Sequence, residues 1–284
     1  MLFKRKIITA LFGNIMSKRK KRDTPLFNHP IIETHCHLDY LKERPLIETL
    51  DQSSAVGVEK IITIAVSPEN LETVMNLTKQ DPRLWGTQGV HPHDAEKYTE
   101  YTEITIRKNA QNERILAIGE IGLDYYYDNA DRAIQRSVFE SQLTIASEMD
   151  LPVVIHSRDA DEDTINILSK FETSLKKKGV IHSFTSGPEL AQYAIDQGFC
   201  LGFNGICTFN SAENVRDIIR MTPVENIILE TDAPFLTPIP YRGTENASFY
   251  LPFIAEKVAD VKNIPIEIFL AQVYENSQTL FFNK

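Results

Sequence analysis

The sequence alternates short apolar runs with longer amphipathic stretches from residue 31 onward. The runs are rich in Ile and Val, and several are apolar at consecutive positions, as expected of strands buried on both faces of a parallel sheet. Eight such runs span residues 31–39, 59–67, 83–93, 115–124, 151–159, 179–186, 199–206 and 226–234. Eight strands alternating with helices predict an α/β fold, a single (β/α)8 TIM-type barrel.

Helices are expected between and after these runs. Segment 131–150 has apolar residues at helical spacing, and segment 187–198 opens with Gly-Pro and closes on a glycine, as helices prefer. Two terminal helices are expected at 249–261 and 265–282. The competing architecture is a doubly wound open sheet, which usually has a Gly-rich phosphate loop after its first strand. Here the first run ends in His-Cys-His instead, which favours the barrel.

The charge of the chain is divided unevenly. Residues 1–22 hold eight Lys and Arg and no acidic residue, which leaves 22 basic against 39 acidic residues elsewhere, a net charge of −17. A body this acidic cannot present the broad basic surface of most nucleic-acid-binding proteins. We expect residues 1–25 to form a basic, disordered N-terminal extension and residues 26–284 to form the barrel. The apolar middle of the extension is short for a secretion signal, and no small-residue cleavage site follows it.

The three cysteines, Cys36, Cys200 and Cys207, show no paired spacing. Such sparse use is typical of reduced thiols in a cytosolic protein, not of a disulfide framework. No apolar stretch approaches the roughly 18 residues needed to cross a bilayer. The sequence therefore predicts a cytoplasmic protein without membrane association, and it implies no stable protein partner.

Histidines are concentrated at the predicted strands. Six of the seven lie in or just after an apolar run, and two acids lie in otherwise apolar runs: His35, His37, His91, His93, His156, His182, Glu120 and Asp232. Taken singly, each is more often a hydrogen-bonded core residue than a ligand. Residues two apart on a strand share a face, and the C-terminal strand ends of a barrel converge on its axis. Four imidazoles and two carboxylates buried there without a partner would be costly, which predicts a bound metal.

Six ligands are too many for one tetrahedral metal with an open position. They divide better over two metals that share a carboxylate, as in sites that clamp both oxygens of a displacement reaction. Mixed nitrogen and oxygen ligands suit zinc, manganese or iron, and a phosphate substrate would also allow magnesium. We therefore expect two divalent ions per chain, with Mg, Zn and Mn as the leading candidates.

Eight ordered motifs make the sequence similar to a known family. They are THCHLD (34–39), GVHPHDA (89–95), AIGEIGLDYY (117–126), LPVVIHSRDA (151–160), GVIHSF (179–184), GFCLGFNGICTF (198–209), ILETDAPFLTP (228–238) and YRG (241–243). Through them the chain resembles, over about residues 31–283, the TatD family of metal-dependent deoxyribonucleases, a branch of the amidohydrolase-like barrels. The family's fold is the same barrel that the strand pattern predicts.

The resemblance implies a ligand set and a base. The metals would be held by His35, His37 and Asp232 at one position and by His156 and His182 at the other, bridged by Glu120. Asp232 resembles the family's general base and would take a proton from the attacking water, whose pKa two metals would lower. Asp232 and Glu120 are thus the candidate catalytic residues.

Substrate contacts are less sharply predicted. His91, Arg158 and Arg242 are candidates for binding phosphate, since guanidinium groups match phosphate oxygens, and residues 125–127 are three tyrosines that could stack on a base. Thr244 stands where the family usually has a lysine, so one basic contact is missing. The resemblance implies that the chain hydrolyses DNA, as an exonuclease on single-stranded ends.

Two alternatives stay open. The first is hydrolysis of amide, ester or lactone bonds, which related two-metal barrels perform. The second is a protein without catalysis that binds metal, or that binds nucleic acid through its basic extension.

Overall fold

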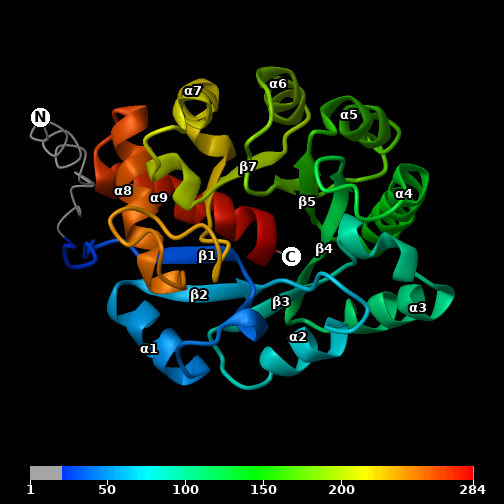
Figure 1. The fold of residues 1–284 in the computed structure, drawn as a ribbon, viewed down its shortest axis with the longest axis horizontal. Coiled ribbons are helices and arrows are strands. Elements are labelled where there is room, and N and C mark those ends of the chain that lie inside the picture. Colours follow the sequence, from blue (N-terminus) through cyan, green and yellow to red (C-terminus); the bar gives the residue numbers. More distant parts are fainter. Residues whose placement is uncertain (1–20, 284) are drawn as a thin grey trace, which may run out of the picture.

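The computed structural model describes residues 21–283, which form a ring of eight parallel strands surrounded by helices (Figure 1). The strands are β1 Ile31–Cys36, β2 Val58–Thr63, β3 Leu84–Gln88, β4 Ile115–Asp124, β5 Val153–Arg158, β6 Gly179–Ile181, β7 Cys200–Phe203 and β8 Ile227–Leu229. Each strand pairs with the next along the chain. A bridge between Cys36 and Ala233 joins the two ends of the sheet. The predicted (β/α)8 barrel is confirmed.

Helices α1 to α8 lie around the ring, between and after the strands as the amphipathic stretches predict, and α9 runs toward its centre (Figure 1). They are α1 Leu46–Ala55, α2 Leu71–Leu77, α3 Glu100–Asn109, α4 Arg132–Met149, α5 Asp161–Ser169, α6 Pro188–Asp196, α7 Glu213–Met221, α8 Leu251–Lys262 and α9 Ile266–Ser277. Local chemistry sets their ends. At α4, for example, the Asp131 carboxylate accepts hydrogen bonds from the backbone N–H groups of Ala133 and Ile134, which have no partner within the helix.

The strands are shorter than the apolar runs, except for β4. The run at 83–93 is a strand only to Gln88, and the run at 226–234 only to Leu229. Beyond these points the backbone leaves the ladder: Asp232, for example, has a left-handed φ of +58°, which no strand accommodates. His91 and Asp232 therefore lie on the loops that follow the strands, and His93 lies in the 3-10 helix η2, Pro92–Lys97.

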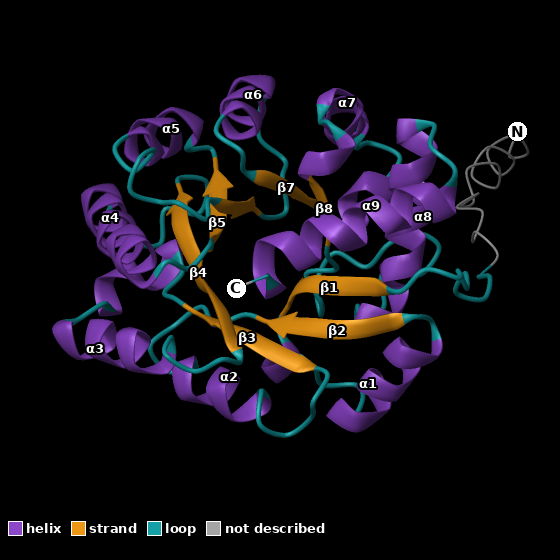
Figure 2. Ribbon diagram, turned by 180° about the vertical axis from the view of Figure 1, so that it is seen from behind, coloured by secondary structure: helices purple, strands orange, loops and turns teal. Residues whose placement is uncertain are grey.

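Apolar side chains fill the interior of the ring. Ile62, Val154 and Ile228 come from different strands and pack with Phe281 near the C-terminus. Figure 2 shows the end of α9 and the C-terminus over the centre of the ring. A second apolar layer, which includes the buried Phe139 of α4, lies between strands and helices. The barrel is therefore a packed core and not a channel. The three cysteines, Cys36, Cys200 and Cys207, are unpaired and buried in it.

The segment at residues 21–30 leads along the surface to β1. Arg22 forms an ion pair with Glu256 of α8, and Lys21 lies 5.1 Å from the ring centre of Tyr241. The rest of the predicted basic extension, residues 1–20, lies outside the described part of the chain. Among residues 21–283, no helix has the length and hydropathy needed to cross a membrane.

Candidate metal centre

The structure brings the six predicted metal ligands together at the C-terminal ends of the strands. They are His35 in β1, His37 just after it, Glu120 in β4, His156 in β5, His182 just after β6 and Asp232 in the loop after β8. His156 and Asp232 are partly exposed to a cavity, and the other four are buried. Convergence of these side chains on one point follows from the parallel barrel, because every strand delivers its last residues to the same end.

Glu120 lies at the centre of this cluster. Its Oε1 atom is 2.7 Å from His182 Nε2, 3.0 Å from His156 Nδ1 and 3.4 Å from His91 Nε2. Its other oxygen, Oε2, is 3.4 Å from His35 Nε2. One carboxylate thus touches imidazoles that come from β1, β5 and the segments following β3 and β6. This is the placement that a shared ligand requires.

Asp232 closes the opposite side of the cluster. Its Oδ1 atom is 3.4 Å from His37 Nε2 and 3.7 Å from His35 Nε2. The left-handed backbone of Asp232, a conformation that Asp adopts more readily than most residues, turns the chain after β8. The Asp232 N–H donates to the His35 carbonyl oxygen at 2.9 Å, so the turn is tied to β1.

The electrostatics of the cluster keep both carboxylates ionised. Burial alone would raise the pKa of Glu120, but the imidazoles around it, His182 and His91 foremost, hold that pKa well below its ordinary value. For Asp232, burial is likewise outweighed by the hydrogen bond from His37 and by nearby imidazole charge, and its pKa is lowered. Burial and the neighbouring His156 lower the pKa of His91, which favours its neutral form.

Two glycines allow the strand that carries Glu120 to approach β5. A Cβ atom on Gly119 would lie 2.6 Å from Val154 Cβ, closer than side chains tolerate. Gly122 has a φ of +137°, and a Cβ there would lie 2.0 Å from the His156 carbonyl oxygen. Any larger residue at either position would push the two strands apart. The glycines therefore help to hold Glu120 within reach of His156.

Several buried nitrogens of the cluster have no hydrogen-bond partner among the described residues. They are both ring nitrogens of His35 and the Nδ1 atoms of His37 and His182; the carboxylates 3.4 Å from His35 Nε2 and 3.7 Å from His182 Nδ1 do not meet hydrogen-bond geometry. Buried polar atoms are normally paired, because an unpaired one loses its hydration without compensation. A divalent cation supplies the missing partner, since neutral imidazole nitrogens and carboxylate oxygens are its usual ligands. The residues present therefore fit a metal.

The possible ligands fall into three overlapping groups, and the ligand atoms of each lie within 4.8 Å of one another. The groups are His35 with His37 and Asp232; His35 with Glu120 and His182; and His91 with Glu120 and His156. Glu120 and His35 each belong to two of them, and Glu120 has two carboxylate oxygens to offer as a bridge. His91, which the sequence suggested only as a phosphate contact, also lies within ligand distance.

Asp124 is a site residue that the sequence analysis missed. It is buried at the end of β4, and its Oδ2 atom is 2.8 Å from His93 Nε2 and 3.1 Å from His156 Nε2. Burial would raise its pKa, but these imidazoles, with that of His156 foremost, bring it well below the usual value. A carboxylate on the far nitrogen of a ligating imidazole fixes its orientation. The signal was present in the sequence, since Asp124 lies four residues after Glu120 and thus on the same face of the strand.

Two further acids that the sequence analysis did not identify contact the segments that carry the predicted ligands. Glu230 is fully buried, accepts a hydrogen bond from Ser183 N at 2.5 Å and lies 3.7 Å from His182 Nδ1. Glu33 accepts from Thr231 N at 2.9 Å, and burial raises its pKa to about 8. Its carboxyl group is then protonated at neutral pH and ties β1 to the segment after β8. Glu33 lies in β1 and Glu230 directly after β8, each two residues before a predicted ligand.

The cluster forms the floor of a cavity of about 750 Å³. His91 and Arg158 both line it, as expected of phosphate contacts. Arg158 has no ion-pair partner among the described residues. Arg242 does not line this cavity and lies over the Phe209 ring, 4.2 Å from its centre. Thr244 is also absent from the cavity wall; its hydroxyl donates to the Tyr241 carbonyl oxygen.

The three consecutive tyrosines have different environments. Tyr125 turns away from the cavity and donates a hydrogen bond to Asp163 Oδ2 at 2.5 Å. Tyr126 and Tyr127 are exposed, and Tyr127 lines the cavity. Of the three, only these two therefore have a ring face available to a substrate.

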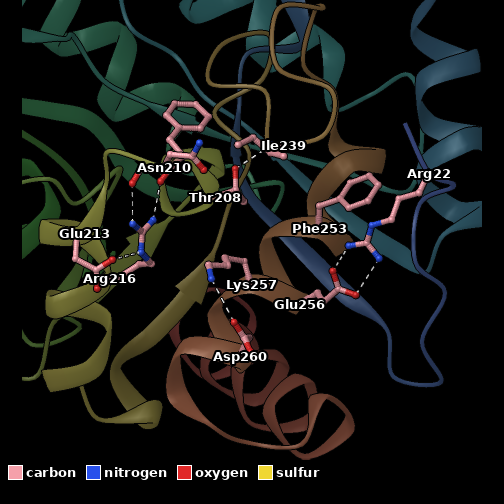
Figure 3. Close-up of a pocket in the computed structure, with 11 residues that line it drawn as sticks. Arg22, Thr208, Asn210, Glu213, Arg216, Ile239, Phe253, Glu256, Lys257 and Asp260 are labelled. Carbon is pink, nitrogen blue, oxygen red and sulfur yellow. Dashed lines mark hydrogen bonds and ion pairs between the residues drawn. The ribbon is translucent and has the colours of Figure 1, made fainter. Parts of the chain in front are cut away.

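A second cavity, of about 640 Å³, lies between α8, the loop after β8, and the segment that runs from the 3-10 helix η3, Gly205–Thr208, into α7 (Figure 3). Its charged side chains form pairs: Arg22 with Glu256, Arg216 with Glu213, and Lys257 with Asp260. We refer to it as the outer cavity and to the first as the inner cavity. Apart from Arg216, the side chains of these pairs are open to solvent.

Comparison with known proteins agrees with this fold and site. The TatD related DNase family matches residues 32–282. The chain is 34% identical over 252 residues to the uncharacterized metal-dependent hydrolase YabD of Bacillus subtilis, covering 88% of this chain and 98% of YabD. It is 33% identical over 270 residues to the deoxyribonuclease Tat-D of Schizosaccharomyces pombe, covering 81% and 85%.

Among solved structures, the TatD homologue YjjV of Escherichia coli K12 superposes with a TM-score of 0.83 at 28% identity, covering 89% of this chain and 98% of YjjV. The fold and the motifs thus place the chain in one group of barrel enzymes. It belongs to the TatD family of metal-dependent hydrolases.

Proposed function

We propose that this chain hydrolyses phosphodiester bonds of DNA, acting on single-stranded ends. The observation that carries the proposal is the position of Glu120, shared between histidine groups on the floor of a cavity whose wall presents an unpaired arginine, Arg158. A metal centre beside a free guanidinium suits a substrate with a phosphate group. The name of the fission yeast relative, a deoxyribonuclease, supports DNA as that substrate.

In this proposal two divalent metal ions, of Mg, Zn or Mn, occupy the cluster. One would be held by His35, His37 and Asp232, and the other by His156 and His182, with Glu120 shared and His91 within reach. When bound, such ions activate water and neutralise charge on a phosphate group.

Asp232 is the proposed general base. It is one of the two partly exposed members of the cluster, so one side of its carboxylate faces the cavity where water and substrate meet. Its lowered pKa keeps it ionised at neutral pH, and a carboxylate oxygen can then accept the proton of the attacking water. The hydrogen bond from His37 and the backbone bond to β1 hold that oxygen in place.

Arg158 is the proposed phosphate-binding side chain. It follows His156 by two residues on β5, so both side chains leave the strand on the same side. No carboxylate neutralises its guanidinium among residues 21–283, and its charge is available to an anionic substrate. Arg242, over Phe209 and outside the inner cavity, would contact DNA only beyond the reacting phosphate.

The preference for single strands follows from the charge of the body. Outside residues 1–22 the chain carries a net −17, which opposes long-range attraction of a duplex. The inner cavity, of about 750 Å³, has the size of a pocket for a small ligand, which suits one or two unpaired nucleotides better than a double helix. Binding must then depend on the metals and a few local contacts.

The test is digestion of end-labelled DNA by metal-stripped protein resupplied with single ions. Single-stranded and duplex oligonucleotides are compared with a panel of esters and lactones under the same conditions. We expect metal-dependent shortening of the single strand from one end. Turnover of a lactone or carboxylic ester with no cleavage of DNA would instead assign the chain to the alternative reaction of the wider superfamily.

A further inference from the structure

The rim of the inner cavity carries exposed aromatic rings. Of five aromatic side chains that are strongly exposed among residues 21–283, three line this cavity, Tyr40, Tyr127 and Phe235, and a fourth, Tyr126, packs against Tyr127. The fifth, Tyr101 of α3, does not line the cavity. Large rings left open to water around one concave site mark a binding surface. Because they are neutral, they can hold a polyanion where the surrounding surface is acidic.

The first platform consists of Tyr40 and Phe235, which come from the loops after β1 and β8. Their ring centres lie 6.4 Å apart, and they lie 5.4 and 6.2 Å, respectively, from the ring of His37. Phe235 is 50% exposed and Tyr40 37%, although both contact a buried histidine. Each therefore has one side fixed on the metal cluster and another open to the cavity.

The second platform consists of Tyr127 with Arg158. The Arg158 guanidinium carbon lies 4.8 Å from the Tyr127 ring centre, and Tyr127 lies edge-on to His93 at 5.3 Å. Tyr126 supports this arrangement, 4.9 Å from Tyr127 and 4.1 Å from the same guanidinium. Tyr127 is 54% exposed, so a flat ligand can reach it.

The two platforms flank the metal cluster. The first contacts His37, which lies beside Asp232. The second contacts His93, which reaches the cluster through Asp124 and His156. A phosphate group held at the cluster would thus have an aromatic surface on either side.

We propose that these platforms stack the nucleobases on the two sides of the cleaved phosphodiester, one base on Tyr40 and Phe235 and the other on Tyr127 and Arg158. The inference rests on the proposed function. Base–aromatic stacking accepts any base, because every base has a π-face, and single-strand binders use it together with arginine planes. In a duplex both faces of each base are already stacked. The platforms therefore select unpaired nucleotides.

The experiment pairs substitutions with abasic substrates. Affinity for a short single-stranded oligonucleotide is measured by fluorescence anisotropy in the metal-loaded Asp232→Asn background, where cleavage does not intervene. Phe235→Leu and Tyr127→Leu each remove one ring but keep apolar bulk, and we expect each to raise Kd about 5- to 100-fold. An oligonucleotide that lacks the base on one side of the target bond should bind the unsubstituted rings more weakly by the same factor. On that abasic oligonucleotide, only one of the two substitutions should still raise Kd, because the other ring no longer has a base to stack on.

Three controls sharpen the result. Tyr101→Leu removes an exposed tyrosine away from the site and should leave Kd unchanged. Tyr127→Phe and Phe235→Tyr keep an aromatic ring, and each should bind as tightly as the Asp232→Asn protein without a further substitution. Metal content of every variant is measured, because Phe235 contacts His37.

The outcomes separate this inference from the proposed function. If the leucine substitutions weaken binding of intact and abasic oligonucleotides by the same factor, the rings act structurally and the proposal of stacking platforms is overturned. Unchanged Kd in both leucine variants would do the same. If the unsubstituted protein binds intact strands better than abasic ones but cleaves none, the platforms stand and the nuclease proposal fails.

Discussion

The inner and outer cavities are similar in size and both are lined by many charged or titratable side chains, yet they differ in how those groups are paired. In the outer cavity, of about 640 Å³, each cation has a carboxylate partner, and most of these side chains are exposed (Figure 3). In the inner cavity, of about 750 Å³, buried imidazole nitrogens lack partners and Arg158 has no counter-ion among the described residues. Both cavities therefore bring many charged or titratable side chains together. Of the two, only the inner cavity has described polar groups that lack a partner.

The difference distinguishes ordinary surface ion pairs, in the outer cavity, from polar groups that are arranged to bind a ligand, in the inner cavity. Exposed ion pairs contribute about 0–1 kcal/mol and can be rearranged at little cost. Buried polar groups without partners destabilise the fold unless a ligand completes them. The inner cavity therefore carries a cost in the free protein that only binding relieves. Matched substitutions in the two cavities test this reading.

The largest effect is expected at Asp232. Asp232→Asn keeps an oxygen ligand but removes the proposed base, so kcat/KM on a single-stranded oligonucleotide should fall by about 10²–10⁴-fold, the usual contribution of a positioned base. The matched change in the outer cavity is Asp260→Asn, which loses only an exposed pair with Lys257 and should leave turnover unchanged. Near-normal turnover of Asp232→Asn with full metal content would end the assignment.

The second comparison sets Glu120 against Glu256. Glu120→Ala removes the shared carboxylate and should reduce occupancy of both metals, measured by elemental analysis. Metal at about 100 times its Kd stabilises the folded state by about 2.7 kcal/mol, so chelation should lower the Tm of the unsubstituted protein by roughly 5 °C or more. Chelation should barely affect Glu120→Ala.

Glu256→Ala is the control for that experiment. It breaks the surface pair with Arg22, and its metal content and its response to chelator should equal those of the unsubstituted protein. Full two-metal occupancy in Glu120→Ala would remove Glu120 from the site, whatever the activity of that variant.

Arg158 and Arg22 give the third comparison. If Arg158 binds the substrate phosphate, Arg158→Ala should raise KM about 10- to 100-fold, the range for hydrogen bonds to a charged group. Arg22→Ala should leave KM unchanged, because Arg22 is already paired with Glu256 at the outer cavity. Steady-state kinetics with metal-loaded protein measures both. Equal effects of the two substitutions would show that general positive charge, not the position of Arg158, matters.

The sequence was sufficient to predict the barrel and to name residues that the structure brings together around Glu120. Hydrophobic periodicity is a local property, and it identified all eight strands; residues such as His35 and Glu120 then follow because parallel strands deliver their ends to one place. The partners of these residues were less predictable. Asp124 was recognisable only once its strand face was known. The contact between Tyr40 and Phe235 depends on how the loop after the first strand meets the loop after the last strand.

Arg242 is a residue that the sequence suggested for the site but that the structure places outside the inner cavity. In the sequence it was as good a phosphate candidate as Arg158, since both are arginines close to motif residues. The structure places Arg158 on a strand that ends in the inner cavity, and Arg242 on the loop after β8, over Phe209 of the outer cavity wall. Loop conformation depends on contacts that periodicity does not encode.

The smallest effect is expected at Thr244, in the loop that separates the two cavities. Leu236 of this loop lines the inner cavity and Ile239 the outer one, while Thr244 lines neither. Thr244→Lys restores the cation usual in the family and can add at most one phosphate contact. Affinity for a single strand should then rise less than about tenfold, and the slope of log K against log salt should steepen by about 0.7. Binding across a salt series measures both, with Thr244→Met as the uncharged control of similar length. A gain shared by Thr244→Met would not be electrostatic, and no gain in Thr244→Lys would place this loop away from the phosphates and leave the inner cavity as the sole contact with DNA in the described part of the chain.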